Sequence, residues 1–249
     1  MAKIEKKYKQ DPILEVICEF QFVPAPRDLT IPGLLYERVK GSFPIKKACQ
    51  VLNHQIVTQP GKLPEPRVSR IDRTQFWSND EKAVVQTSDN FVCINHQTPY
   101  PTWKGYFPMV QEGLAAYMEA AGNPAIKSIG LRYINKIDVP ERPMHMADYF
   151  ALHIGFPEGL ETDYDDFSLA LTIPGTETGS FTRVQLSSAP RPEGLELQRV
   201  ILDLDHRVTY AQPAGKDTAL DRVDKSHMQL RDMFESFITA KTRRIFGRP

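Results

Sequence analysis

The alternation of apolar and polar residues is clearest near the start of the chain, at residues 11–23. One face of this segment carries Leu14, Val16, Cys18, Phe20 and Phe22, and the other carries Glu15, Glu19 and Gln21. A period of two residues is typical of a β-strand with one buried face. Pro24 and Pro26 follow it and end the predicted strand.

A second long strand is predicted at residues 126–139, and we treat it as the centre of the fold. Its alternation places Arg132, Ile134 and Lys136 on one face. The other face carries Leu131, Tyr133, Asn135 and Ile137. Pro140 and Pro143 end the strand.

Shorter segments complete the predicted pattern. Apolar residues at helical spacing predict helices from Pro32 to Pro44, from Phe107 to Ala121 and from Met146 to Ile154. The closing helix carries apolar residues from Leu220 to Ile238 and is predicted to continue, with Arg243 and Arg244 near its end and Gly247 after it. Thr218 and Asp221 look like the start of the last helix. The remaining predicted strands are residues 54–57, 68–77, 83–87, 91–95, 167–173, 181–187 and 197–210.

An internal repeat is predicted because apolar, aromatic and proline positions of the first half recur after a shift of 113 positions. The shift places Ile13 on Ile126 and Phe43 on Phe156 without a gap. It defines two halves, 11–124 and 125–249, packed as one intimate unit. The predicted fold class is α+β, with tandem β-α-β(3–4)-α repeats forming a curved antiparallel sheet whose helices pack on one side. This arrangement resembles the TATA-box-binding-protein fold, and that analogy implies no DNA binding.

Composition narrows the possible functions. Lys plus Arg and Asp plus Glu number 31 each, so the formal net charge is zero. Because contacts to phosphates normally need a basic surface, nucleic-acid binding is disfavoured, although it stays an alternative. The three cysteines are far apart, which favours reduced thiols. No apolar run is long enough for a signal peptide or a membrane span, so we expect a cytoplasmic protein without a membrane partner.

Three segments carry a resemblance to a known family. They are residues 12–22, the central Gly130–Asn135 with the letters GLRYIN, and the end from Met233 to Gly247. Together they resemble a sporadically distributed prokaryotic family of uncharacterised proteins of about 250 residues. The resemblance implies a cytoplasmic protein, and the scattered distribution is compatible with mobile or defence-related gene clusters. The family supplies no catalytic residues to transfer.

The candidate ligand-binding residues lie mostly on the two long strands. Glu19 and Arg132 occupy matched positions under the 113-residue shift, so we expect them to lie close together on one face. An arginine beside a carboxylate forms an ion pair or holds an anionic ligand, and Asn135 could add amide hydrogen bonds. A purely structural ion pair is the simpler interpretation.

Asp203 and Asp205 form the other candidate pair. On a strand they share a face, whereas His206 points to the opposite side. Two carboxylates could bind a divalent metal or do acid–base work, but a strand with one solvated face gives the same pattern. No phosphate-binding loop, nucleophile elbow or His-Glu-x-x-His motif occurs, and we expect no cofactor and no metal site.

These observations favour a non-catalytic binding or adaptor protein that contacts a protein partner or a second copy of itself. An enzyme or small-molecule sensor with a site between the halves is the first alternative. A nucleic-acid binder that uses the sheet face is the second.

Overall fold

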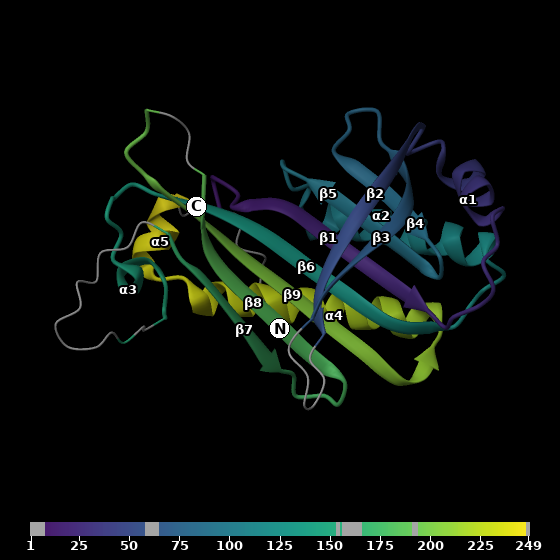
Figure 1. Cartoon of the computed structure of the whole chain (residues 1–249). Helices are drawn as coiled ribbons and strands as arrows, with labels where there is room; N and C mark the ends of the chain where they lie inside the picture. The colour runs from purple at the N-terminus through teal and green to yellow at the C-terminus, as the bar shows by residue number, and fades with distance from the viewer. Residues whose placement is uncertain (1–7, 58–64, 153–154, 156–165, 191–193, 248–249) are drawn as a thin grey trace.

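The two strands with the clearest alternation, β1 (Ile13–Phe22) and β6 (Ile126–Val139), pair antiparallel at the centre of a curved, open sheet (Figure 1). Val16 lies opposite Tyr133, and Ile17 lies opposite Arg132. The structure is a computed structural model that describes residues 8–57, 65–152, 155, 166–190 and 194–247, with the backbone alone for 51–57 and 65–69.

Within the described residues the sheet has nine strands in the order β2-β3-β4-β5-β1-β6-β9-β8-β7, and all neighbours are antiparallel. The other strands are β2 (Ile45–Val57), β3 (Glu65–Trp77), β4 (Ala83–Ser88), β5 (Phe91–Gln97), β7 (Ser168–Pro174), β8 (Ser180–Ala189) and β9 (Gln198–Ala214). The α+β class and the curved antiparallel sheet are therefore confirmed.

The two predicted halves lie on either side of the central pair. From β1 outward the strands run β5, β4, β3 and β2, and from β6 outward they run β9, β8 and β7. In both halves the chain leaves the centre, returns at a sheet edge and proceeds strand by strand inward. The ancestral duplication and the TATA-box-binding-protein analogy stay predictions.

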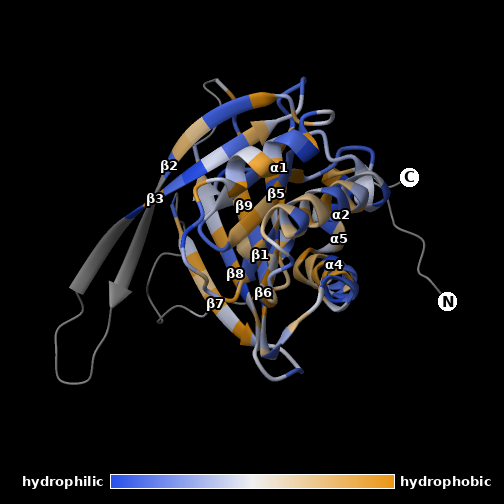
Figure 2. Ribbon diagram, turned by 90° about the vertical axis from the view of Figure 1, so that its right-hand side faces the viewer, coloured by the Kyte–Doolittle hydropathy of each residue, from blue (hydrophilic) through white to orange (hydrophobic). Residues whose placement is uncertain are grey.

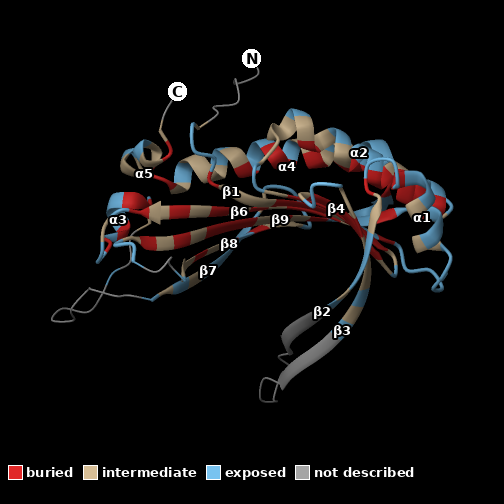
Figure 3. Cartoon of the chain, turned by 90° about the horizontal axis from the view of Figure 1, so that it is seen from above, coloured by how far each residue is buried: buried red, intermediate tan, exposed pale blue. Residues whose placement is uncertain are grey.

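The helices lie along one face of the sheet, and the edges of the sheet bend away from them (Figures 2 and 3). They are α1 (Ile31–Val39), α2 (Thr102–Ala120), α3 (Met146–Tyr149), α4 (Lys216–Phe237) and α5 (Ala240–Ile245). We call the covered side the helix face and the opposite side the concave face. Among the described residues no helix is long and apolar enough to cross a membrane.

The core occupies the helix face, as the alternation predicted. Phe20 of β1, Leu131 of β6, Leu204 of β9 and Leu114 of α2 are all fully buried there. Burying one such side chain contributes about 1.5–3 kcal/mol. A Cβ on Gly113 would lie 2.7 Å from Ile94, so this glycine allows α2 to approach β5 closely.

Stacked rings of α2 and α4 join the two halves on the helix face. The Trp103 ring of α2 stacks on His227 of α4 at 4.0 Å, and its Nε1 donates to Asp224 at 2.8 Å. Tyr133 of β6 completes the contact, since its hydroxyl lies 2.8 Å from Nδ1 of His227. His227 is therefore a buried core histidine whose ring contacts come from Tyr133 and Trp103.

The ends of the last helix differ from the prediction. α4 begins at Lys216 after Gly215, without a side-chain cap, so Thr218 and Asp221 do not start it. The helix ends at Phe237, and Thr239 caps α5 by accepting from the backbone amides of Lys241 and Thr242. A threonine at a helix N-cap satisfies amides that otherwise lack partners, which explains the break in one predicted helix.

Candidate functional site

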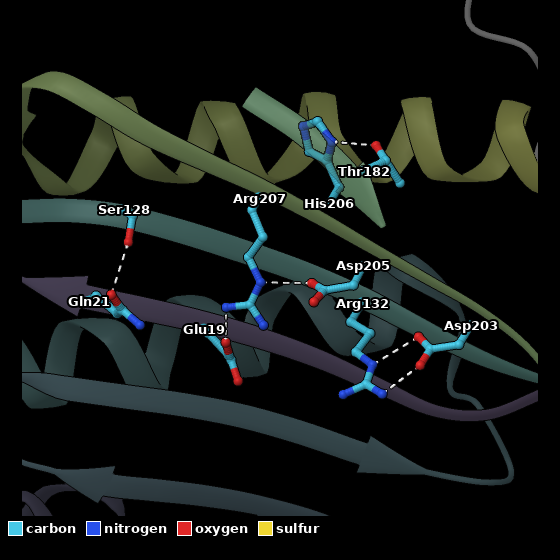
Figure 4. Close-up of polar contacts among 9 residues, drawn as sticks. All are labelled: Glu19, Gln21, Ser128, Arg132, Thr182, Asp203, Asp205, His206 and Arg207. Atoms are coloured by element: carbon cyan, nitrogen blue, oxygen red, sulfur yellow. Dashed lines mark hydrogen bonds and ion pairs between the residues drawn. The ribbon is translucent and has the colours of Figure 1, made fainter. Parts of the chain in front are cut away.

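The concave face gathers four of the five candidate residues on three neighbouring strands (Figure 4). Glu19 of β1, Arg132 of β6, and Asp203 and Asp205 of β9 share this face by register. Arg207 of β9 joins them. We call these five residues the concave-face cluster.

Arg132 and Asp203 form the first ion pair of the cluster. Nε of Arg132 donates to Oδ1 of Asp203 at 2.8 Å, and Nη2 donates to Oδ2 at 2.5 Å. The two parallel bonds form a bidentate fork, which is the strong geometry for arginine and a carboxylate. This hydrogen bonding raises the pKa of Arg132, despite its partial burial.

Arg207 forms two further ion pairs, and the one with Glu19 reaches across three strands. Its Nη1 donates to Glu19 on β1, and its Nε donates to Asp205 at 2.8 Å. The intervening strand carries Gly130 opposite Arg207, and a Cβ there would lie 2.9 Å from Nη1. The missing side chain at Gly130 therefore leaves the space through which the guanidinium reaches Glu19.

Glu19 and Arg132 lie on the same face, as the 113-residue shift predicted. Glu19 opposes Gly130 and Ile17 opposes Arg132, so the two residues are diagonal neighbours across the central strand pair. Their hydrogen bonds go elsewhere: Glu19 accepts from Arg207, and Arg132 donates to Asp203. Each half therefore contributes charges to the cluster, and β9 supplies the hydrogen-bonding partners of both Glu19 and Arg132.

Asn135 lies on the helix face and takes no part in the cluster. It is 2% exposed, and its Nδ2 donates to the carbonyl of Leu202 at 3.0 Å. The alternation had already placed Asn135 opposite to Arg132. Its amide therefore satisfies the backbone inside the core, which removes the main reason to treat it as a ligand contact.

A row of hydrogen-bonded polar side chains continues the concave face across the first half. Nδ2 of Asn95 donates to Glu15 at 2.7 Å, and Nε2 of Gln86 donates to Asn95 at 3.1 Å. Gln75 then donates to Gln86 at 2.9 Å, and Trp77 donates to Gln75 at 3.1 Å. We call Glu15, Asn95, Gln86, Gln75 and Trp77 the amide row. Hydrogen bonds in series hold these side chains in fixed positions.

The groups that most often act as nucleophile or base are poorly placed here. Cys93 is on this face but only 1% exposed, and burial raises the pKa of its thiol well above the ordinary value. His96 and His206 lie on the helix face, where His206 contacts Thr182 at 2.9 Å. Burial lowers the pKa of His206. As predicted, His206 points away from Asp203 and Asp205.

Two pockets lie at the rims of the sheet and away from the cluster. One of ≈ 290 Å³ is lined by residues of the segment before α1 and of β2 and β3, among them Arg27 and Arg73. The other, of ≈ 410 Å³, lies near Ser188 and Arg199. Neither is lined by Glu19, Arg132, Asp203 or Asp205.

Comparisons with protein-family models, with curated proteins and with solved structures find no match to this chain.

The cluster contains members that the sequence interpretation missed. Arg207 was visible in principle, because it shares the alternation of Asp203 and Asp205 within one strand. Gly130 carried no such signal, since its role depends on which strands lie on each side of it. The amide row depends on contacts between β1, β5, β4 and β3, which no local pattern encodes.

Proposed function

We propose that this protein is a non-catalytic binding protein, which holds an extended segment of a protein partner on its concave face. One observation carries the proposal. Ordered polar side chains from β1, β3, β4, β5, β6 and β9 cover a face that no described helix covers. Buried polar groups cost stability unless they are hydrogen-bonded, and these side chains bond to one another within the concave-face cluster and within the amide row.

The arrangement of the carboxylates favours binding over catalysis. Asp203 and Asp205 are engaged by Arg132 and Arg207, so neither is positioned as a free general base. The enzyme or sensor alternative would need an enclosed site next to these residues, whereas the two pockets described above lie at the rims.

The pairing of the arginines disfavours nucleic acid on this face. Arg132 and Arg207 donate to carboxylates of the same chain. A phosphate would have to displace these carboxylates before it could accept the same hydrogen bonds. A polypeptide segment with side chains of both charges fits better, because the cluster alternates acidic and basic groups.

The charge pattern also indicates where a partner would make contact. The side chain of Arg132 is 37% exposed, and Arg183 of β8 is exposed beside Asp205 on the same face. Gln21 is the exposed position at the end of β1. These side chains border the buried part of the cluster, so a partner can reach them without disturbing the core.

A comparative capture experiment tests the proposal. The concave-face variant combines Arg183→Glu with the exchange of Arg132→Asp and Asp203→Arg, which keeps the ion pair but reverses its polarity. Lys225→Glu on the exposed side of α4 is the matched control. We expect a native lysate to yield proteins that bind the unmodified chain and the control but not the concave-face variant.

Site-specific crosslinking locates the contact. A photoreactive residue at Gln21 should capture the same protein, whereas one at Lys225 should not. Equal capture by all variants would contradict the proposal. Tight binding of a double-stranded oligonucleotide that weakens steeply with salt would instead support the nucleic-acid alternative.

The resemblance to a sporadically distributed prokaryotic family suggests a cellular location and a genomic setting for this binding protein. We propose a cytoplasmic adaptor encoded in mobile or defence-related gene clusters. Inspection of the neighbouring genes tests this part independently of the binding experiments.

A further inference from the structure

The edge strand β7 has unusual chemistry for an exposed edge. In the described part of the chain it pairs with β8 alone, and its sequence is Ser-Leu-Ala-Leu-Thr-Ile-Pro without a charged residue. Leu171 is 38% exposed and Ile173 is 36% exposed. Proteins usually protect such edges with charges, because the unpaired backbone groups accept another strand.

The opposite edge of the sheet shows this protection. Strand β2 carries Lys46 and Lys47, which are both exposed. Charged side chains, lysine above all, keep a second strand from docking. The two edges therefore differ in chemistry, and β7 is the one suited to pairing.

Alternate residues of β7 bond to β8, and the backbone groups of the residues between them point to the open edge. The amide of Ser188 donates to Phe167 at 3.0 Å, and the amide of Gly175 donates to Ser180 at 2.9 Å. The odd-numbered residues of β7 therefore bond to β8. The amides of Ser168, Ala170 and Thr172 point to the open edge, and Pro174 has no amide hydrogen to offer.

We propose that β7 pairs antiparallel with β7 of a second copy, in a two-fold register centred on Ala170. In this register Ser168 lies opposite Thr172 of the second copy, and Ala170 lies opposite Ala170. Three outward amides in each of two chains then make about six new hydrogen bonds. Pro174 limits the ladder at both ends.

The side chains agree with the same register. On the helix face exposed Leu171 meets half-buried Leu169 of the second copy, so pairing covers the exposed Leu171 side chain. The strand carries no charge, so two identical strands meet without like-charge repulsion. A self-complementary strand matches the two-fold symmetry of most homodimers. This inference is independent of the concave face and of its proposed partner.

Sedimentation of the full chain over a wide concentration range tests the dimer. Ala170→Pro removes an outward amide without breaking a bond to β8, so it should raise the dimer dissociation constant by more than about tenfold. Ala170→Thr keeps the amide and should stay dimeric. Circular dichroism checks that both variants are folded.

Disulfide crosslinking tests the register in a Cys49→Ser background. Ala170→Cys should crosslink on oxidation, because an opposed hydrogen-bonded pair has Cα atoms about 5.5 Å apart, within disulfide range. Thr172→Cys should not crosslink with itself, since the two positions are about 14 Å apart. A mixture of Ser168→Cys and Thr172→Cys chains should crosslink.

A chain that stays monomeric at every concentration would overturn the inference. A dimer that survives Ala170→Pro, or that crosslinks through Thr172→Cys alone, would overturn it as well, because pairing would then use another surface or register.

Discussion

Arg207 on β9 contacts Glu19 on β1 across the intervening strand β6, through the space that Gly130 leaves open. Strands separated by a neighbour seldom share an ion pair, because the side chains of the middle strand lie in the way. The contact ties the two halves of the sheet together on the face that lacks helices.

Gly130→Val should destabilise the protein. The new side chain would displace the Arg207 guanidinium and leave Glu19, whose side chain is 16% exposed, without its partner. We expect a loss of about 1–3 kcal/mol in the free energy of unfolding, measured by chemical denaturation. In an Arg207→Ala background Gly130→Val should lower the free energy of unfolding by much less. Equal costs in both backgrounds would show that Gly130 serves another purpose.

Arg132→Met should lower the free energy of unfolding by more than the removal of an exposed lysine does. It leaves Asp203, which is 8% exposed, as an unpaired carboxylate. We expect a loss of about 1–3 kcal/mol. Lys40→Met is the matched control, because Lys40 pairs with exposed Glu37 in solvent and its removal should leave the free energy of unfolding almost unchanged. Similar costs for the two variants would mean that the Arg132–Asp203 pair is solvated.

The free energy of unfolding should decrease as the pH is lowered, because of His227. Burial lowers the pKa of His227 to about 4, whereas the unfolded chain has the ordinary value of 6.5. The unfolded state therefore binds the proton first, so stability is full above pH 6.5 and declines as the pH falls toward 4. Protonation of this side chain in the unfolded state should lower the free energy of unfolding by about 2 kcal/mol between pH 7 and pH 5.

The neighbours of His227 and a matched variant sharpen this test. Arg231 further lowers the pKa of His227 and Asp224 raises it, while His206 also has a lowered pKa and adds a decline of the same sign. His227→Gln should flatten the dependence of unfolding free energy on pH. An unchanged slope would assign the decline to other groups.

The cysteines should react very unequally with a thiol reagent at neutral pH. Cys18 and Cys93 are buried, and burial raises the pKa of both thiols, whereas Cys49 is partly exposed. Mass spectrometry should find one rapid modification in the native protein and three after denaturation. Rapid labelling of Cys93 would reveal that the concave face opens in solution.

The alternation of apolar residues predicted the faces of β1 and β6 well, because burial on one side imposes it directly. It separated Arg132 from Asn135 correctly and placed Asp203 and Asp205 together. The partners of these residues could not be predicted, since they depend on strand order and register over long distances along the chain. The break before Thr239 was missed because a single cap residue interrupts an otherwise helical pattern.

The central strand pair also has a kinetic consequence. Val16 pairs with Tyr133, and Gly130 pairs with Arg207, so the middle of the sheet closes only after most of the polypeptide has been synthesised. Contacts between such distant positions slow folding, because long loops must close before the contacts form. A nascent chain therefore keeps one side of β1 open while the second half emerges, and this interval is when a chaperone would be most useful.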